Sequence, residues 1–176
     1  MACCRRNCQR RNQPTVRVFN DNNFIPSSVQ VSYPLTQVVE PNTEMLFPQV
    51  DYNTGVSFST RVDNYGVDIV APGVYKITFT GIITTQQDQT VSVAITLNGE
   101  PIPQSEISQL VLSQGPQTVY TTIVFKVISP SANIGVANIG TESFSITNAK
   151  LDIVRIGNFW NNNTKKHLIL RCFYKN

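Results

Sequence analysis

Polar and apolar residues alternate along most of the chain after residue 55. Such alternation is typical of strands with one buried face, because successive side chains of a strand point to opposite sides. No window shows a 3.6-residue apolar period bounded by helix caps. The alternating stretches are residues 55–61, 67–70, 74–83, 91–97, 118–127, 133–139 and 144–154.

Turn-forming residues separate these stretches. Ala71-Pro72-Gly73 ends one of them, and Asn98-Gly99 follows residues 91–97 as a strong two-residue hairpin signal. Short strands punctuated in this way predict an all-β protein, an antiparallel two-sheet sandwich in jelly-roll order. A length of 176 residues predicts one such domain with additional tails.

The large apolar residues that share a strand face form the predicted core. Within residues 74–83, for example, Tyr75, Ile77 and Phe79 project to the same side. The residues expected to be mainly buried are Val74, Tyr75, Ile77, Phe79, Val93, Ile95, Leu97, Ile123 and Phe125.

The two ends of the chain lack this regular pattern. Residues 12–50 are rich in Asn, Pro, Ser and Gln, with two short extended stretches at 15–19 and 29–33. We therefore expect an N-terminal arm over residues 1–39, the sandwich over 40–156 and a basic extension over 157–176. A terminal strand is predicted at residues 166–174. Within the arm, Val16, Val18 and Phe19 alternate with polar residues.

All four cysteines lie near the termini. They are Cys3, Cys4, Cys8 and Cys172. A disulfide between the adjacent Cys3 and Cys4 is strained, and Cys172 can accept one partner only. Full oxidation therefore needs a small Cys3–Cys8 or Cys4–Cys8 loop, or bonds to other chains. Because cytosolic disulfides are usually unstable, either the thiols stay reduced and bind something, or the protein is oxidised after release from the cell.

Charge is sparse and segregated. Charged residues make up 14% of the chain, against about 25% in ordinary globular proteins. Residues 1–12 carry +4 from Arg5, Arg6, Arg10 and Arg11, residues 165–176 carry +4, and the stretch between them has six basic and eleven acidic residues. The basic ends fit the acidic body of a neighbouring subunit, although terminal basic residues can also simply be solvated.

Motifs for other function classes are absent from the sequence. The first residues contain no apolar signal region, and no apolar run approaches the roughly 18 residues that span a bilayer. His167 is the single histidine, and no catalytic serine or zinc-protease motif occurs. We expect no enzyme activity, no cofactor and no membrane partner.

Metal binding and nucleic-acid binding are two alternative functions for the N-terminal residues. Cys3, Cys4 and Cys8 supply three thiolates, with Cys172 or His167 as a fourth ligand. Structural zinc sites usually use Cys-x-x-Cys pairs, which this chain lacks, so we expect no metal. The arginines of residues 3–11 suit phosphate, but no aromatic residue is interleaved for base stacking, so we expect no nucleic acid.

Two segments of the body resemble a known family. Residues 72–78 read Pro-Gly-Val-Tyr-Lys-Ile-Thr, and residues 93–103 run through Asn98-Gly99 to Glu-Pro-Ile-Pro. They resemble the tumour-necrosis-factor and complement-globular-head superfamily, over roughly residues 40–156. The bacterial branch at the C-terminus of the exosporium collagen-like glycoprotein is the nearest in pattern. The resemblance implies a trimeric jelly roll, but this chain has no Gly-X-Y stalk. Part of the predicted core would then line the trimer axis.

The arm has a resemblance of its own. A Cys-Cys pair with a third cysteine shortly after it, and no leader, resembles the N-terminal connector of endospore appendage subunits. That resemblance implies intersubunit disulfides from the arm, through Cys3, Cys4, Cys8 and Cys172, to neighbouring subunits. It also implies that the protein is made without a signal peptide and oxidised later, at the spore surface.

The sequence hypothesis is a structural protein. We expect homotrimers stacked into a disulfide-crosslinked fibre on a bacterial endospore, with a spore-coat or exosporium protein as a possible anchor. The alternative is a trimeric head of a spore-surface or phage fibre that binds a glycan or a receptor. Stoichiometry separates the two, because a fibre subunit assembles without limit and a head stops at three copies.

Overall fold

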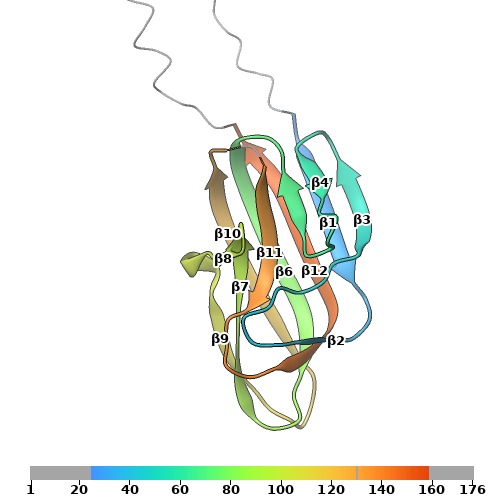
Figure 1. Cartoon of the computed structure of the whole chain (residues 1–176), viewed down its shortest axis with the longest axis vertical. Helices are drawn as coiled ribbons and strands as arrows, with labels where there is room; N and C mark the ends of the chain where they lie inside the picture. The colour runs from blue at the N-terminus through green and yellow to red at the C-terminus, as the bar shows by residue number, and fades with distance from the viewer. Residues whose placement is uncertain (1–24, 130, 159–176) are drawn as a thin grey trace, which may run out of the picture.

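The computed structural model describes residues 25–129 and 131–158, which form two antiparallel sheets packed face to face (Figure 1). The described strands are β1 (Ser27–Tyr33), β2 (Gln37–Val39), β3 (Gln49–Thr54), β4 (Phe58–Thr60), β5 (Val67–Ile69), β6 (Gly73–Thr84), β7 (Gln89–Leu97), β8 (Glu100–Pro101), β9 (Ile107–Val111), β10 (Gln117–Val127), β11 (Ala132–Asn138) and β12 (Phe144–Gly157). One 3-10 turn, η1, covers Pro103–Ser105. The prediction of an all-β antiparallel sandwich is confirmed.

The first sheet has the order β10-β6-β12-β1-β3, with β2 added to β12. The second has the order β4-β5-β11-β7-β8, with β9 added to β7. The last strand, β12, therefore lies in the middle of this sheet, between β6 and the first strand, β1. Strands far apart in sequence pair directly, as the jelly-roll order predicted from the sequence requires.

Alternation along β6, β10 and β12 places one face of the first sheet in the core. Ile77 pairs in register with Ile123 on one side and Ile153 on the other, and all three side chains point inward. Such same-face neighbours on adjacent strands are close enough to contact one another. Tyr75 and Phe79 flank this row on β6 and are fully buried.

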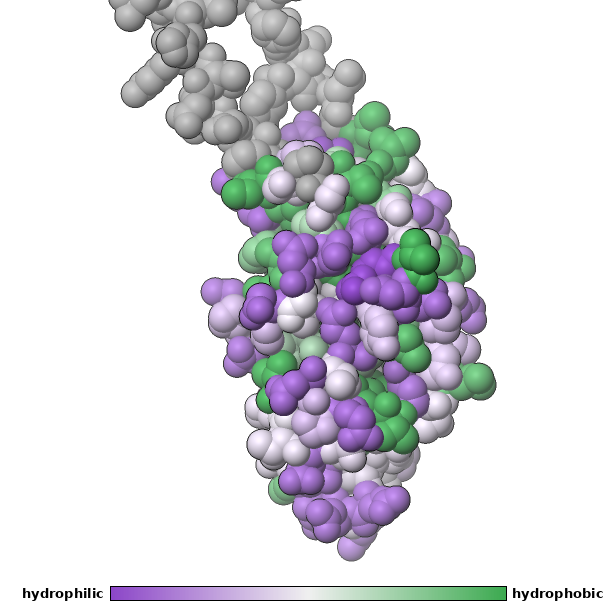
Figure 2. Space-filling view, viewed as in Figure 1, coloured by the Kyte–Doolittle hydropathy of each residue, from purple (hydrophilic) through white to green (hydrophobic). Residues whose placement is uncertain are grey.

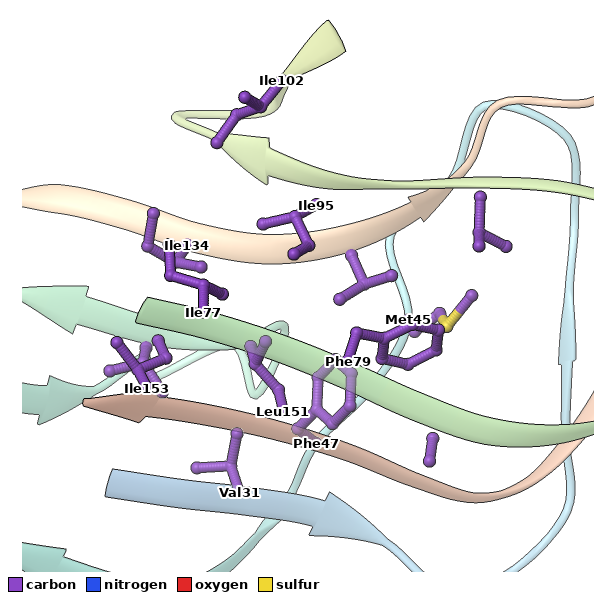
Figure 3. Close-up of a cluster of buried hydrophobic side chains, with 14 of the residues drawn as sticks. Val31, Met45, Phe47, Ile77, Phe79, Ile95, Ile102, Ile134, Leu151 and Ile153 are labelled. Carbon is purple, nitrogen blue, oxygen red and sulfur yellow. The ribbon is translucent and has the colours of Figure 1, made fainter. Parts of the chain in front are cut away.

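The second sheet supplies the opposite half of the core. Ile95 of β7 and Ile134 of β11 point toward Ile77 and Leu151 of the first sheet (Figure 3). Phe47, from the segment between β2 and β3, packs edge-on against Phe79 with ring centroids 6.4 Å apart. The core therefore lies between the two sheets.

Three residues expected in the core are only partly buried. Val74 alternates with the buried Tyr75 and so projects to the outer face of the first sheet. Leu97 and Phe125 contact the core but keep part of their surface exposed. Leu97 ends β7 beside its hairpin, and Phe125 lies on β10, an outermost strand of its sheet. Ile123 and Val93 are buried.

The sandwich begins earlier than the arm assignment of residues 1–39 implied. β1 pairs with β12 along its whole length, from Ser27 opposite Arg155 to Tyr33 opposite Ala149. Val29 and Val31 are fully buried. Residues 27–39 therefore belong to the sandwich, because β1 is held between β12 from the far end of the chain and the nearby β3.

The stretch 55–61 is not a continuous strand. Gly55 adopts φ +82, and a side chain there would collide with Ser27 Oγ. Glycine tolerates this conformation at little cost, so the chain turns between β3 and β4. β3 itself, exposed at every position, was not predicted.

We expect truncation of a fully buried aromatic residue to be far more damaging than truncation of a peripheral one. Phe79→Ala should lower the free energy of unfolding by about 3–5 kcal/mol. Phe125→Ala should cost clearly less, since Phe125 is only partly buried. Urea denaturation under reducing conditions measures both. Equal losses would contradict this assignment of the core.

Candidate functional site

The predicted cysteines and arm residues lie outside the described residues. These are Cys3, Cys4, Cys8, Cys172, Arg5, Arg6, Arg10, Arg11, Val16, Val18 and Phe19. The predicted terminal strand at 166–174 also lies there. Within residues 25–129 and 131–158, no group of three or more His, Cys, Asp or Glu side chains could hold a metal ion. None of the helices in that part of the chain is long and apolar enough to cross a membrane.

Both terminal segments are attached to the same end of the sandwich (Figure 1). Ser27, at the start of β1, pairs with Arg155 near the end of β12, and Ser28 pairs with Thr54 at the end of β3. The antiparallel pairing of the first and last strands makes this unavoidable. The cysteine-bearing segments therefore start as neighbours.

Arg155 connects the loops at this end. Its Nη2 donates to the carbonyl oxygen of Pro72 at 2.9 Å and to Asn158 Oδ1 at 3.1 Å. A side chain at position 73 would approach Arg155 Nε to 2.9 Å, so the guanidinium fits only because residue 73 is glycine. The Arg155 Nε is buried and has no hydrogen-bond partner among the described residues. Arg155 thus holds the beginning of the C-terminal segment against the β5–β6 loop.

Five exposed apolar side chains lie at the same end of the sandwich as Arg155. We call the following five residues the apolar end, with the exposed fraction of each: Ile25 52%, Val56 73%, Val70 42%, Ile128 66% and Ile156 46%. They come from the start of β1, three loops and the end of β12. Figure 2 shows hydrophobic surface gathered where the two terminal segments leave. Contiguous apolar surface of this kind marks an interaction site.

The opposite end carries a mainly polar cleft, and Val38, Leu110 and Leu112 are exposed at the same end. The cleft has a volume of about 580 Å³ and lies between the β6–β7 and β11–β12 turns. We call it the tip cleft; its lining residues are Val38, Thr84, Thr85, Gln86, Gln87, Gln89, Glu142, Ser143, Phe144 and Ser145. Gln89 Nε2 donates to the carbonyl oxygen of Ser143 at 2.8 Å and so joins the two turns. The Thr85 hydroxyl is buried without a hydrogen-bond partner in the described part of the chain.

A further contact orders the tip beside the cleft. Asp88 Oδ1 accepts hydrogen bonds from the backbone N–H of Ser113 at 2.8 Å and from its hydroxyl at 2.9 Å. These two bonds favour the charged carboxylate and lower the pKa of Asp88. The β6–β7 turn is therefore bound to the β9–β10 turn as well.

The outer face of the first sheet carries a third distinct surface. Strand register places Thr122, Thr78, Asp152, Gln30 and Tyr52 in one row across five strands. The Tyr52 hydroxyl donates to Asp152 Oδ1 at 3.1 Å. Partial burial, and after it this hydrogen bond, raise the pKa of Tyr52, so the phenol stays a donor.

Exposed apolar side chains flank this row. Tyr120 and Val124 project from β10 with 53% and 65% of their surface exposed. The outer face is therefore a mixture of hydroxyls, exposed apolar groups and three lysines, Lys76, Lys126 and Lys150. The exposed aromatic and aliphatic groups, Tyr120 and Val124, are the part of this face whose chemistry suits a protein contact.

The outer face of the second sheet is closed by an ion-pair network. Arg61 contacts Glu44 Oε2 at 2.9 Å and Asp63 Oδ2 at 2.7 Å. The other oxygen of Glu44 accepts from the Thr96 hydroxyl at 2.7 Å. The hydrogen bond from Arg61 is the main cause of the lowered pKa of Asp63. This network fixes the segment around Glu44 over Gly135, so the role of this face is structural.

We expect Gly135→Ala to disrupt that network. An added Cβ would lie 2.6 Å from Glu44 Oε1, 2.9 Å from Thr96 Oγ1 and 2.9 Å from the Tyr65 carbonyl oxygen. Overpacking of this kind typically costs about 1–3 kcal/mol. Gly115→Ala is the control, because nothing lies within 4 Å of the added atom. Thermal unfolding of both variants tests this, and equal stabilities would contradict it.

The body and the terminal segments have opposite charge. Residues 25–158 contain five basic and ten acidic residues, a net charge of −5, whereas residues 1–24 and 159–176 each carry +4. Attraction between exposed charges is screened over about 8 Å at physiological salt. The segregation therefore favours contacts between a terminal segment and a nearby body over contacts between two terminal segments.

The architecture is that of the tumour-necrosis-factor and complement-globular-head jelly roll. Eiger TNF from S. frugiperda matches with 11% identity and a TM-score of 0.60, over 78% of this chain and 96% of that one. Murine APRIL matches with 14% identity and a TM-score of 0.57, over 75% and 100%. The globular domain of zebrafish complement 1qA matches with 10% identity and a TM-score of 0.56, over 76% and 99%.

These structural likenesses establish the fold class and nothing narrower. No protein-family model and no curated protein sequence matches the chain. A jelly roll of this type is typically non-enzymatic. Function has therefore to be argued from the surfaces described above.

Proposed function

We propose that this protein is a structural subunit that self-assembles into a disulfide-crosslinked fibre on the surface of a bacterial endospore. The observation that carries the proposal is the attachment of both cysteine-bearing segments to one end of the sandwich. In every copy of the domain, both cysteine-bearing segments therefore start from the same end. The resemblances of the sequence to exosporium and endospore-appendage proteins support the endospore surface as its location.

Chain length allows the arm to reach a neighbouring subunit. A twelve-residue strand such as β6 is about 40 Å long. Cys8 precedes Ser27 by 19 positions, which extend to about 60 Å at most. Cys172 follows Gly157 by 15 positions, or about 50 Å when extended. The arm can therefore pass the whole length of one domain, as a link between stacked copies requires.

The fibre would be built from homotrimers. Jelly rolls of the matching class typically trimerise, and the outer face of the first sheet, with Tyr120 and Val124, is the surface that we expect in the contact. Three arms per trimer raise the effective concentration of each crosslinking partner. The opposite charges of arm and body would accelerate docking, and the disulfides would make it durable.

Deleting residues 2–13 should leave a folded protein that no longer polymerises, because the arm thiols and arginines are lost while the sandwich is complete. Negative-stain electron microscopy of oxidised protein measures fibre length. A Cys3→Ser, Cys4→Ser, Cys8→Ser variant is the matched control: it keeps the arginines, so it should dock reversibly without covalent links.

The same preparation tests whether Cys172 is the disulfide partner of the arm cysteines. Oxidised parent protein should give a ladder of multimers in non-reducing electrophoresis, and Cys172→Ser should shorten or abolish that ladder. A parent that runs only as a monomer rules out intersubunit disulfides. Fibres of normal length and strength from the protein lacking residues 2–13 would refute the arm as connector.

The tip cleft favours a second candidate, a trimeric head that binds a glycan or receptor. It lies at the end remote from the terminal segments, and hydroxyl and amide side chains line most of it. Those groups suit a neutral, hydroxyl-rich ligand such as a sugar, and the volume is within the range of small-ligand pockets.

On this second reading, Gln87→Ala should weaken binding to a glycan array by about fivefold, the effect of one hydrogen bond of roughly 1 kcal/mol. Gln114→Ala is the control, since Gln114 is exposed at the same tip and does not line the cleft. Absence of any glycan bound by the parent, together with unlimited polymerisation, would leave the fibre as the function.

A further inference from the structure

The apolar end brings together five side chains that are each 42–73% exposed, and such patches are often functional. Val56 and Ile128 are among the most exposed apolar residues of the described chain, at 73% and 66%. Val70 and Ile156 extend the surface across the β5–β6 loop and the end of β12. The tip cleft at the opposite end is lined mostly by hydroxyl and amide groups.

The contacts of Arg155 show in which direction the C-terminal segment begins. Its guanidinium donates to the Pro72 carbonyl oxygen and to the side chain of Asn158, the last described residue. Pro72 lies two residues after Val70, so the chain after Asn158 starts beside the apolar end. Gly157 pairs with Val74 of β6, which also keeps the chain on the sandwich up to that point.

The next two residues in the sequence are Phe159 and Trp160. We infer that the apolar end is the docking surface for these two aromatic side chains of the same subunit. Aromatic residues bury about 150–250 Å² each, which is the scale of surface that the five apolar residues leave exposed. No loop closure is required, because the occupant follows directly on β12.

A second copy of the chain is the rival occupant. It is disfavoured because Phe159 and Trp160 are joined directly to the domain, so their effective concentration at the apolar end exceeds that of a separate copy. Intramolecular docking also has a consequence for the C-terminal segment. With Trp160 held on the domain, Cys172 is 12 positions away, a reach of about 40 Å. Docking would thus restrict which partners Cys172 meets. The docking itself does not depend on the fibre proposal.

Trp160 is the single tryptophan of the chain, so its fluorescence reports on this contact alone. In the full-length protein, kept reduced to prevent crosslinking, we expect blue-shifted emission and protection from acrylamide quenching. Val56→Ser should shift the docking equilibrium toward the exposed state by about tenfold, since a buried valine contributes about 1.5 kcal/mol. Val56 is mostly exposed in the described domain, so this variant should fold normally.

Val38→Ser is the matched control: the same substitution, at a residue 64% exposed, at the opposite end. It should leave the quenching unchanged. Trp160→Ser should in turn increase the binding of an apolar dye such as anilinonaphthalene sulfonate.

Three results would overturn the inference. Parent protein quenched as readily as free tryptophan amide would mean that Trp160 is not docked. Equal responses to Val56→Ser and Val38→Ser would place any contact elsewhere. Protection that disappears on dilution would identify a second copy as the occupant.

Discussion

The pairing of the first strand with the last is the constraint on which the rest of this structure depends. β12 lies between β6 and β1, so its inward residues Leu151 and Ile153 contact the core from the middle of the sheet. Without β12, β1 and β3 would have no sheet to join. The same pairing forces both terminal segments to one end, which makes the ends of the sandwich chemically different. The core and the proposed assembly chemistry thus follow from a single long-range contact.

Four surfaces result, and their chemistry assigns them different roles. The outer face of the second sheet is closed by Arg61, Glu44 and Thr96, whose charged and polar groups satisfy one another. The outer face of the first sheet leaves Tyr120 and Val124 exposed beside polar groups. One end is apolar and carries the terminal segments; the other carries the mainly polar tip cleft.

The distribution of charge determines which parts of neighbouring subunits attract one another. A body of net charge −5 with two terminal segments of +4 disfavours contacts between terminal segments and favours contact with a body. In the proposed fibre this would select the neighbouring domain as the docking site of the arm, and oxidation would then make the contact permanent. In the binding-head alternative the same terminal segments would serve as an anchor, and the tip cleft would be the working surface.

Alternation of side chains is a local property, and it was sufficient to predict β6, β7, β10 and the other regular strands, together with the all-β class. It also placed Tyr75, Ile77 and Phe79 on one face. It could not assign residues 27–39, because Val29 and Val31 lie on a strand whose place in the sheet depends on pairing with β12, more than a hundred positions away. The turn at Gly55, likewise, depends on its approach to Ser27.

The candidate sites also include features that the sequence shows and features that only the fold creates. The cysteines, the arginines of the arm and the segregation of charge can be read from the sequence, since they are matters of residue type and order. The apolar end cannot, because Ile25, Val56, Val70, Ile128 and Ile156 are scattered over the chain and meet only after the sheets have formed. Sequence alone determined which chemistry the terminal segments carry. The tertiary structure decided where that chemistry is attached, because strand pairing between distant segments sets the position of every loop.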